Sequence, residues 1–182
     1  MNMAFIRKGA VKERKVPEFE NLSAPEDLVK LAEEKGVNTN PINVSELAQV
    51  LGVLVRFEPL PDDTSGSLVK DKRSGSWIMT VNSLHHPHRQ RFTIAHEIAH
   101  RICHAANSDS FEDKTFFRNG ESNWMEAEAN QFAATLLMPE SEFVSYIDNI
   151  SSKVEDLAKH FQVSSMAVRI RAKVLGYEGH NL

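Results

Sequence analysis

Residues 91–100 read Arg-Phe-Thr-Ile-Ala-His-Glu-Ile-Ala-His, and the rest of the chain is organised around them. At about 3.6 residues per helical turn, His96 and His100 lie one turn apart on one face, so both imidazoles can reach a single cation at about 2.0–2.1 Å. Glu97 flanks that face and can serve as the general base in metal-assisted hydrolysis. The segment therefore predicts a metal-binding helix with His96 and His100 as ligands and Glu97 as the catalytic residue.

The other side of this helix is apolar. Ile94, Ile98 and Ile102 recur at four-residue intervals, which is the pattern of a helix that buries one face. The alternative is a surface helix that carries two histidines by chance, because the five-residue motif alone is a moderate signal. The apolar stripe favours the buried helix.

The composition is that of an ordinary soluble globular protein of about one domain. The chain has 182 residues, of which 41% are hydrophobic and 25% charged, and no apolar run is long enough to span a bilayer. The formal charge of −4 gives no overall attraction to nucleic acid or to anionic membranes. Cys103 is the single cysteine, which excludes an internal disulfide, and no secretory signal is visible. We therefore expect a cytoplasmic protein with no membrane partner.

The patterns before the metal helix predict two helices and three strands. Residues 1–22 are basic and poor in core-forming side chains, and they indicate a flexible N-terminal arm. Helical signals follow over 23–36 and 44–51, and strand signals over 53–57, 67–70 and 76–82. The expected fold class is α+β, with a small antiparallel sheet packed against a helical core.

An edge strand of this sheet would offer its backbone to an extended peptide, which can bind as an additional strand. The segment from Trp77 to Asn82 is the candidate edge, and Trp77, Met79, Val81 and Asn82 are the candidate substrate-binding residues. The alternative is an interior strand with no ligand contact.

A catalytic zinc site usually has three protein ligands and one open position, so a third ligand is needed. Helical signals resume over 123–138, which Pro139 ends, and this segment carries Glu126 and Glu128. The two carboxylates point about 160° apart on a helix, so at most one faces the metal. Asn130 lies one turn beyond Glu126, where its amide could orient a ligand. Position alone does not separate the two glutamates.

Three blocks of sequence together resemble the ImmA/IrrE family of zinc metallopeptidases. The blocks are Val81-Asn82, then Arg91-Phe92-Thr93-x-Ala95-His96-Glu97-x-x-His100, then Glu126-x-x-Ala129-Asn130-x-Phe132-Ala133-Ala134-x-Leu136-Leu137-Met138-Pro139. The two long blocks are more specific than the five-residue motif, and the resemblance covers residues 25–140.

The resemblance implies a zincin-like helical core with a gluzincin-like site. In that site His96, His100 and Glu126 hold zinc, and Glu97 is the catalytic base. The resemblance also implies cleavage of a specific protein, a helix-turn-helix repressor of the XRE type, in stress, mobile-element or phage-defence circuits, with nucleic acid as a candidate activator. A His/His/Glu set would also hold other transition metals, so Mn²⁺ is an alternative to Zn²⁺.

Two residues after the motif lie close to the ligand face. On an ideal helix, Cys103 and His104 fall roughly 60° and 40° from His100. His104, which resembles a histidine often found after the family's motif, is interpreted as a residue that supports a ligand or packs beside it. A Cys103 thiolate could occupy the open metal position as a latch, and the alternative is a buried structural thiol.

The C-terminal residues have the outline of a helix-turn-helix. Capping and apolar patterns predict two short helices near 152–164 and 167–176, and Arg169, Arg171 and Lys173 could meet phosphates. The same pattern occurs when two short helices support an enzyme. We expect a metallopeptidase domain over 23–140, with 141–182 as a C-terminal helical part of the same domain.

Two other functions stay open from the sequence. A DNA-binding regulator would use the C-terminal helices and keep a structural metal site. A protein-interaction module, such as one half of a toxin–antitoxin pair, would bind its partner without cleaving it.

Overall fold

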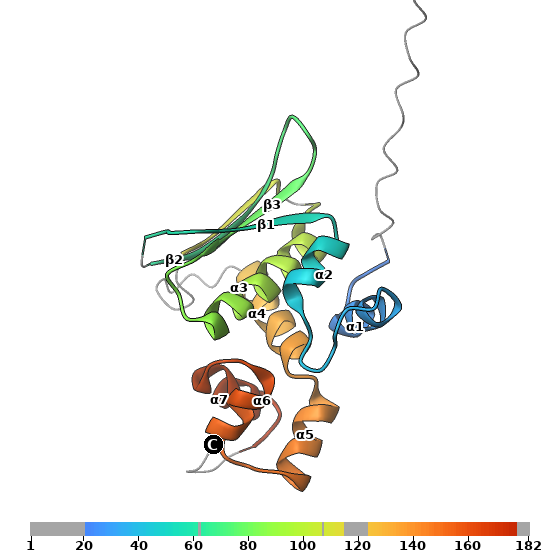
Figure 1. The fold of residues 1–182 in the computed structure, drawn as a ribbon, viewed down its shortest axis with the longest axis vertical. Helices are drawn as coiled ribbons and strands as arrows, with labels where there is room; N and C mark the ends of the chain where they lie inside the picture. The colour runs from blue at the N-terminus through green and yellow to red at the C-terminus, as the bar shows by residue number, and fades with distance from the viewer. Residues whose placement is uncertain (1–20, 62, 107, 115–123, 178–182) are drawn as a thin grey trace, which may run out of the picture.

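The computed structural model describes residues 21–61, 63–106, 108–114 and 124–177. A four-stranded sheet forms one layer, α2 and α3 lie against it, α4 packs on the other side of α3, and α5, α6 and α7 form a further group beyond α4 (Figure 1). The helices are α1 (Pro25–Glu34), α2 (Val44–Val50), α3 (Pro87–Ala99), α4 (Trp124–Leu137), α5 (Glu140–Asn149), α6 (Val154–Phe161) and α7 (Ser165–Val174). The strands are β1 (Val53–Glu58), β2 (Thr64–Lys70), β3 (Trp77–Asn82) and β4 (Ser110–Lys114), and a short π-helix, η1 (His100–His104), continues α3.

The α+β fold class is confirmed, with one difference in the sheet. The strand order is β1-β3-β2-β4. β2 runs antiparallel to both β3 and β4, whereas β1 and β3 are parallel. β2 is therefore not next to β1 in the sheet. One strand position separates them, and β3, which follows β2 in the chain, occupies that position. The sheet is therefore mixed rather than wholly antiparallel.

The prediction that 77–82 forms an edge strand is wrong. β3 pairs with β1 on one side and with β2 on the other, so its backbone cannot accept an added strand. The side chains of Trp77, Met79, Val81 and Asn82 are all buried. Asn82 has a structural task, because its amide donates to Thr64 O at 2.9 Å and its Oδ1 accepts from Leu84 N at 3.0 Å. The four residues expected to bind substrate thus belong to the interior.

The other predicted elements are present with small shifts in their ends. The first helix begins at Pro25 rather than at Ser23, and Asp27 caps it by accepting a hydrogen bond from Ala24 N at 3.0 Å. Two elements were not predicted, namely β4, in a polar stretch without clear alternation, and α5. The predicted basic arm lies almost wholly outside the described residues. None of the described helices combines the length and apolarity that a bilayer span requires.

α3 is the central element of the fold. His86 caps it by accepting from His88 N at 3.2 Å, and Pro87 occupies its first turn. Every residue from Thr93 to Ala99 is buried, because α3 lies between the sheet and α4. Arg91 donates to Ile42 O and so attaches α3 to the segment before α2. The His-Glu-x-x-His motif therefore sits in the interior rather than on the surface.

β2 approaches α3 very closely at Gly66. A Cβ atom added to Gly66 would lie 2.7 Å from Thr93 Cγ2 and 2.8 Å from Thr80 O. Contacts this short essentially never occur for real Cβ atoms, so no other residue fits without a shift of the helix or the strand. The same added atom would lie 3.7 Å from Glu97 Oε1, which shows that the Glu97 carboxyl faces β2 at this point.

We predict that Gly66→Ala lowers the free energy of unfolding by about 1–3 kcal/mol, because the added methyl overpacks the α3–β2 contact. Urea unfolding followed by circular dichroism measures this. Adding Thr93→Ser removes the nearest obstructing atom and should restore part of the loss, since the serine hydroxyl can keep the Thr93 bond to Arg89 O. A Gly66→Ala protein as stable as the wild type would contradict the close approach.

Candidate metal centre

Three side chains from α3, η1 and α4 converge on one point. The Nε2 atoms of His96 and His100 are 3.0 Å apart. Each also lies 3.2 Å from a carboxylate oxygen of Glu126, His96 from Oε2 and His100 from Oε1. Within the described part of the chain, this is the one group of three or more His, Cys, Asp or Glu residues whose ligand atoms all lie within 4.8 Å of one another. The three residues could hold a metal ion.

Small residues allow the two helices to bring these groups together. Ala95 and Ala99 of α3 and Ala129 and Ala133 of α4 are fully buried, and α3 packs extensively on α4. The imidazoles of His96 and His100 are almost fully buried, whereas the side chain of Glu126 is 40% exposed. The centre is therefore open to solvent on the Glu126 side.

The hydrogen bond made by His96 determines its tautomer. His96 Nδ1 lies 3.0 Å from Asn130 Oδ1. An amide oxygen accepts, so Nδ1 carries the proton and the lone pair of Nε2 points toward Glu126 and His100. Asn130 thus lies where the sequence spacing predicted an orienting amide, one turn beyond Glu126.

The tautomer of His100 follows from a longer chain of contacts. His104 Nε2 lies 2.9 Å from Glu128 Oε2, and a carboxylate accepts, so that nitrogen carries a proton. When His104 is neutral, it accepts through Nδ1, which is 2.9 Å from His100 Nδ1. His100 then donates from Nδ1, and its Nε2 lone pair is directed at Glu126. From the sequence, Glu128 was considered only as a metal ligand, and its contact with His104 was not predicted. The available signal was its spacing of two residues from Glu126, which turns it to another face of the helix.

The donor set fits a cation better than a proton. With these tautomers, the facing atoms of His96, His100 and Glu126 are all acceptors, which repel one another unless a cation lies between them. Burial lowers the pKa of His100, which disfavours a proton there. Neutral imidazoles and an ionised carboxylate are the states in which these groups bind a metal.

Glu97 is fully buried on α3, beside His96. Its position about 100° around the helix from His96 turns it toward β2, where Gly66 leaves space for its carboxyl. Glu97 follows His96 in the sequence, but it is not one of the three residues whose ligand atoms meet.

The structure gives no geometric support for Cys103 as a metal latch. η1 winds more widely than the α-helix assumed in the sequence argument, and Cys103 packs against the hydrophobic core rather than in the convergent group. Burial, and secondarily the charge of Glu128, raise the pKa of the Cys103 thiol, which favours its neutral form.

Phe111 of β4 forms one wall of the centre. Its ring stacks on the imidazole of His100, with centroids 4.6 Å apart and planes inclined by 17°. The same ring lies 6.5 Å from Trp77. β4 is the last strand of the sheet on this side in the described part of the chain. The strand edge close to His100 is therefore that of β4, and not that of β3 as the sequence suggested.

Comparisons with known proteins agree with this arrangement. The family model described as "IrrE N-terminal-like domain" (Peptidase_M78) matches residues 48–173. The chain is 32% identical over 131 residues to the radiation response metalloprotease IrrE of Deinococcus radiodurans, covering 66% of this chain and 37% of that protein. A Mycobacterium tuberculosis transcriptional regulator shares the fold, with a TM-score of 0.58 at 17% identity over 82% of this chain and 46% of that one.

The chain thus spans less than half the length of either relative. The family match covers the sheet, the α3–α4 pair and most of the C-terminal helices, including all the convergent residues. The resemblance seen in the sequence is confirmed, and the chain belongs to the ImmA/IrrE family, through its IrrE N-terminal-like domain.

Proposed function

We propose that this protein is a zinc-dependent endopeptidase that cleaves a specific protein substrate. The observation that carries the proposal is the convergence of His96, His100 and Glu126 on one point, beside the buried Glu97. The relative from Deinococcus radiodurans is itself described as a metalloprotease. His96, His100 and Glu126 are the proposed ligands, and Glu97 is the proposed catalytic base.

A zinc ion held by these ligands would polarise a peptide carbonyl and make water more acidic. Glu97 would accept a proton from the attacking water and pass it to the leaving amine. Asn130 and His104 would hold the two imidazoles with their Nε2 lone pairs directed inward. The aromatic ring of Phe111 would keep His100 from rotating.

The edge of β4 is the proposed docking position for the scissile segment. A strand edge binds an extended peptide through backbone hydrogen bonds, and β4 lies directly beside His100 through Phe111. The proposed substrate is a helix-turn-helix repressor of the XRE type, whose removal would derepress stress, mobile-element or phage-defence genes in the cytoplasm.

We predict that Glu97→Gln reduces cleavage by at least about 10²-fold while leaving the bound zinc in place, because the base is lost and the ligands remain. The test incubates wild type and variant with the repressor encoded beside the gene and identifies fragments by mass spectrometry. Metal analysis of both proteins is the control. Equal cleavage by the variant would refute the role of Glu97, whereas a stable complex with an intact repressor in both would favour an interaction module.

We predict that His104→Ala and Asn130→Ala each weaken zinc affinity by about 10–100-fold, because each change removes the group that orients one ligand. Competition with a chromogenic chelator measures the affinity. His160→Ala is a matched control, since His160 Nε2 lies 2.9 Å from Glu142 Oε1 on α5, a contact as short as that of His104 with Glu128. Equal losses in all three variants would indicate general destabilisation instead.

We predict that removing the metal lowers the melting temperature by about 8–16 °C. Zinc present at a thousandfold excess over its Kd stabilises the folded state by about 4 kcal/mol, and each kcal/mol shifts the melting temperature of a chain of this size by about 2–4 °C. Calorimetry before and after dialysis against EDTA measures the change. Re-addition of Zn²⁺ should restore the higher value more fully than Mn²⁺; no shift on chelation would argue against the site.

A DNA-binding regulator is the second candidate, favoured by the paired helices α6 and α7 and by the exposed Arg169 and Lys173. Arg171, the third cation expected at phosphates, is only 4% exposed and donates to Met138 O at 3.0 Å. This alternative requires salt-sensitive DNA affinity that survives Glu97→Gln and falls on replacing Arg169 and Lys173.

A further inference from the structure

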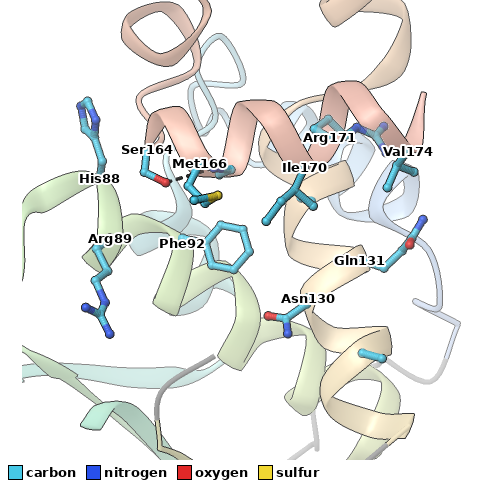
Figure 2. Close-up of a pocket in the computed structure, with 13 residues that line it drawn as sticks. His88, Arg89, Phe92, Asn130, Gln131, Ser164, Met166, Ile170, Arg171 and Val174 are labelled. Carbon is cyan, nitrogen blue, oxygen red and sulfur yellow. Dashed lines mark hydrogen bonds between the residues drawn. The ribbon is translucent and has the colours of Figure 1, made fainter. Parts of the chain in front are cut away.

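A cavity that the proposed peptidase reaction does not use adjoins the candidate metal centre at Asn130. It has a volume of about 510 Å³ and lies between α7 and the α3–α4 pair (Figure 2). Most of its lining is apolar. The apolar part is formed by Phe92 of α3, Ala127 and Ala134 of α4, and Met166, Ile170 and Val174 of α7. Cavities of this size and character typically hold small molecules.

α7 presents a regular row of three apolar residues to this space. Met166, Ile170 and Val174 are spaced by four residues, so they lie on one helix face, and they remain 58%, 44% and 55% exposed. Met166 and Ile170 point from α7 toward Phe92 of α3 (Figure 2). Three large apolar side chains exposed in a row around a hollow are unusual on a protein surface that binds nothing, and they indicate an apolar ligand.

The width of the cavity favours a small molecule over a helix. Arg171 fixes α7 to the end of α4 through hydrogen bonds to Met138 O at 3.0 Å and Thr135 Oγ1 at 3.2 Å. A helix about 10–12 Å across would fill a volume of 510 Å³ within roughly one turn of its length. The fixed spacing therefore suits a ligand body of modest size.

The cationic side chain of Arg89 lines one end of the cavity. His88, Arg89 and Ser164 line it there, and they also line an adjoining hollow to which His86 and Lys159 contribute. No Asp or Glu is among the residues that line the apolar cavity, and Glu155 is the single carboxylate of the adjoining hollow. Arg89 donates to the neutral hydroxyl of Ser65 at 3.0 Å, and among the described residues no carboxylate forms an ion pair with it. The charge complement of this end is an anion.

Asn130 connects the cavity to the metal centre. It lines the cavity, and its Oδ1 lies 3.0 Å from Nδ1 of His96. A ligand packed against Asn130 would restrain the amide in the orientation that directs the His96 lone pair inward. A molecule bound in the cavity would therefore change how firmly His96, a proposed metal ligand, is held.

We propose that this cavity binds a small amphipathic anion, with an aliphatic body against α7 and an anionic head near Arg89, and that its occupancy strengthens metal binding through Asn130. The coupling rests on the proposed metal function, whereas the binding does not. Binding is therefore measured on metal-free protein, so that failure of the cavity and failure of the metal site can be told apart.

Isothermal titration of metal-free protein with decanoate should give one saturable site, and decyltrimethylammonium should bind at least about tenfold more weakly. Ile170→Glu should weaken decanoate binding at least about tenfold, because it places a like charge in the apolar wall. Leu54→Glu, on β1, is the matched control: Leu54 is 50% exposed and Ile170 is 44% exposed. Arg89→Gln should remove the preference for the anion.

Three outcomes would overturn the binding site: no saturable binding of decanoate, equal binding of the cationic probe, or equal affinities in the Ile170→Glu and Leu54→Glu proteins. For the coupling, saturating decanoate should tighten zinc binding by about fivefold or more in the wild type. It should have no such effect in Asn130→Ala. Zinc affinity that is unchanged or weakened by decanoate in the wild type would refute the coupling.

Discussion

The structure depends on the burial of four polar side chains along the inner side of α3 and its continuation. Thr93, His96, Glu97 and His100 are all 0–1% exposed, and buried polar groups destabilise a fold unless they have partners. Thr93 donates to its own helix at Arg89 O. His96 instead bonds to Asn130 of α4, and His100 bonds to His104, which in turn contacts Glu128 of α4. The position of α4 against α3 is therefore set by hydrogen bonding as well as by apolar packing.

This requirement explains why the residues that orient the histidines and the residues that could bind a metal lie on the same helix faces. Glu126 and Asn130 lie one turn apart on α4, so the register that brings Asn130 to His96 also brings the carboxylate to both Nε2 atoms. Glu128 points elsewhere on α4 and reaches His104, because η1 extends the helix past the centre. A shift of one residue between α3 and α4 would disrupt both sets of contacts together.

The sequence predicts the parts of this design that depend on local patterns. Helical periodicity identified α3 and α4, the motif spacing identified a shared face for His96 and His100, and one-turn spacing identified Asn130. The order of the strands could not be predicted, since the place of β3 depends on where the chain after β1 crosses the sheet. β4 lacks alternation and forms through pairing with β2 and the contact of Phe111 with His100. Choosing between Glu126 and Glu128 likewise required the helix–helix contact or the family resemblance.

The C-terminal helices show that a helix-turn-helix pattern in the sequence does not by itself establish a DNA-binding surface. From the sequence, three cations on the second helix were available to phosphates, yet Arg171 is buried and holds α7 to α4. Val168 and Ala172 of α7 pack in the core, whereas Met166, Ile170 and Val174 face α3 and α4 across a hollow. α7 is held to the end of α4 by Arg171 and leaves a cavity along its length. Because Asn130 lines that cavity and contacts His96, the arrangement of α7 is physically linked to the candidate metal centre.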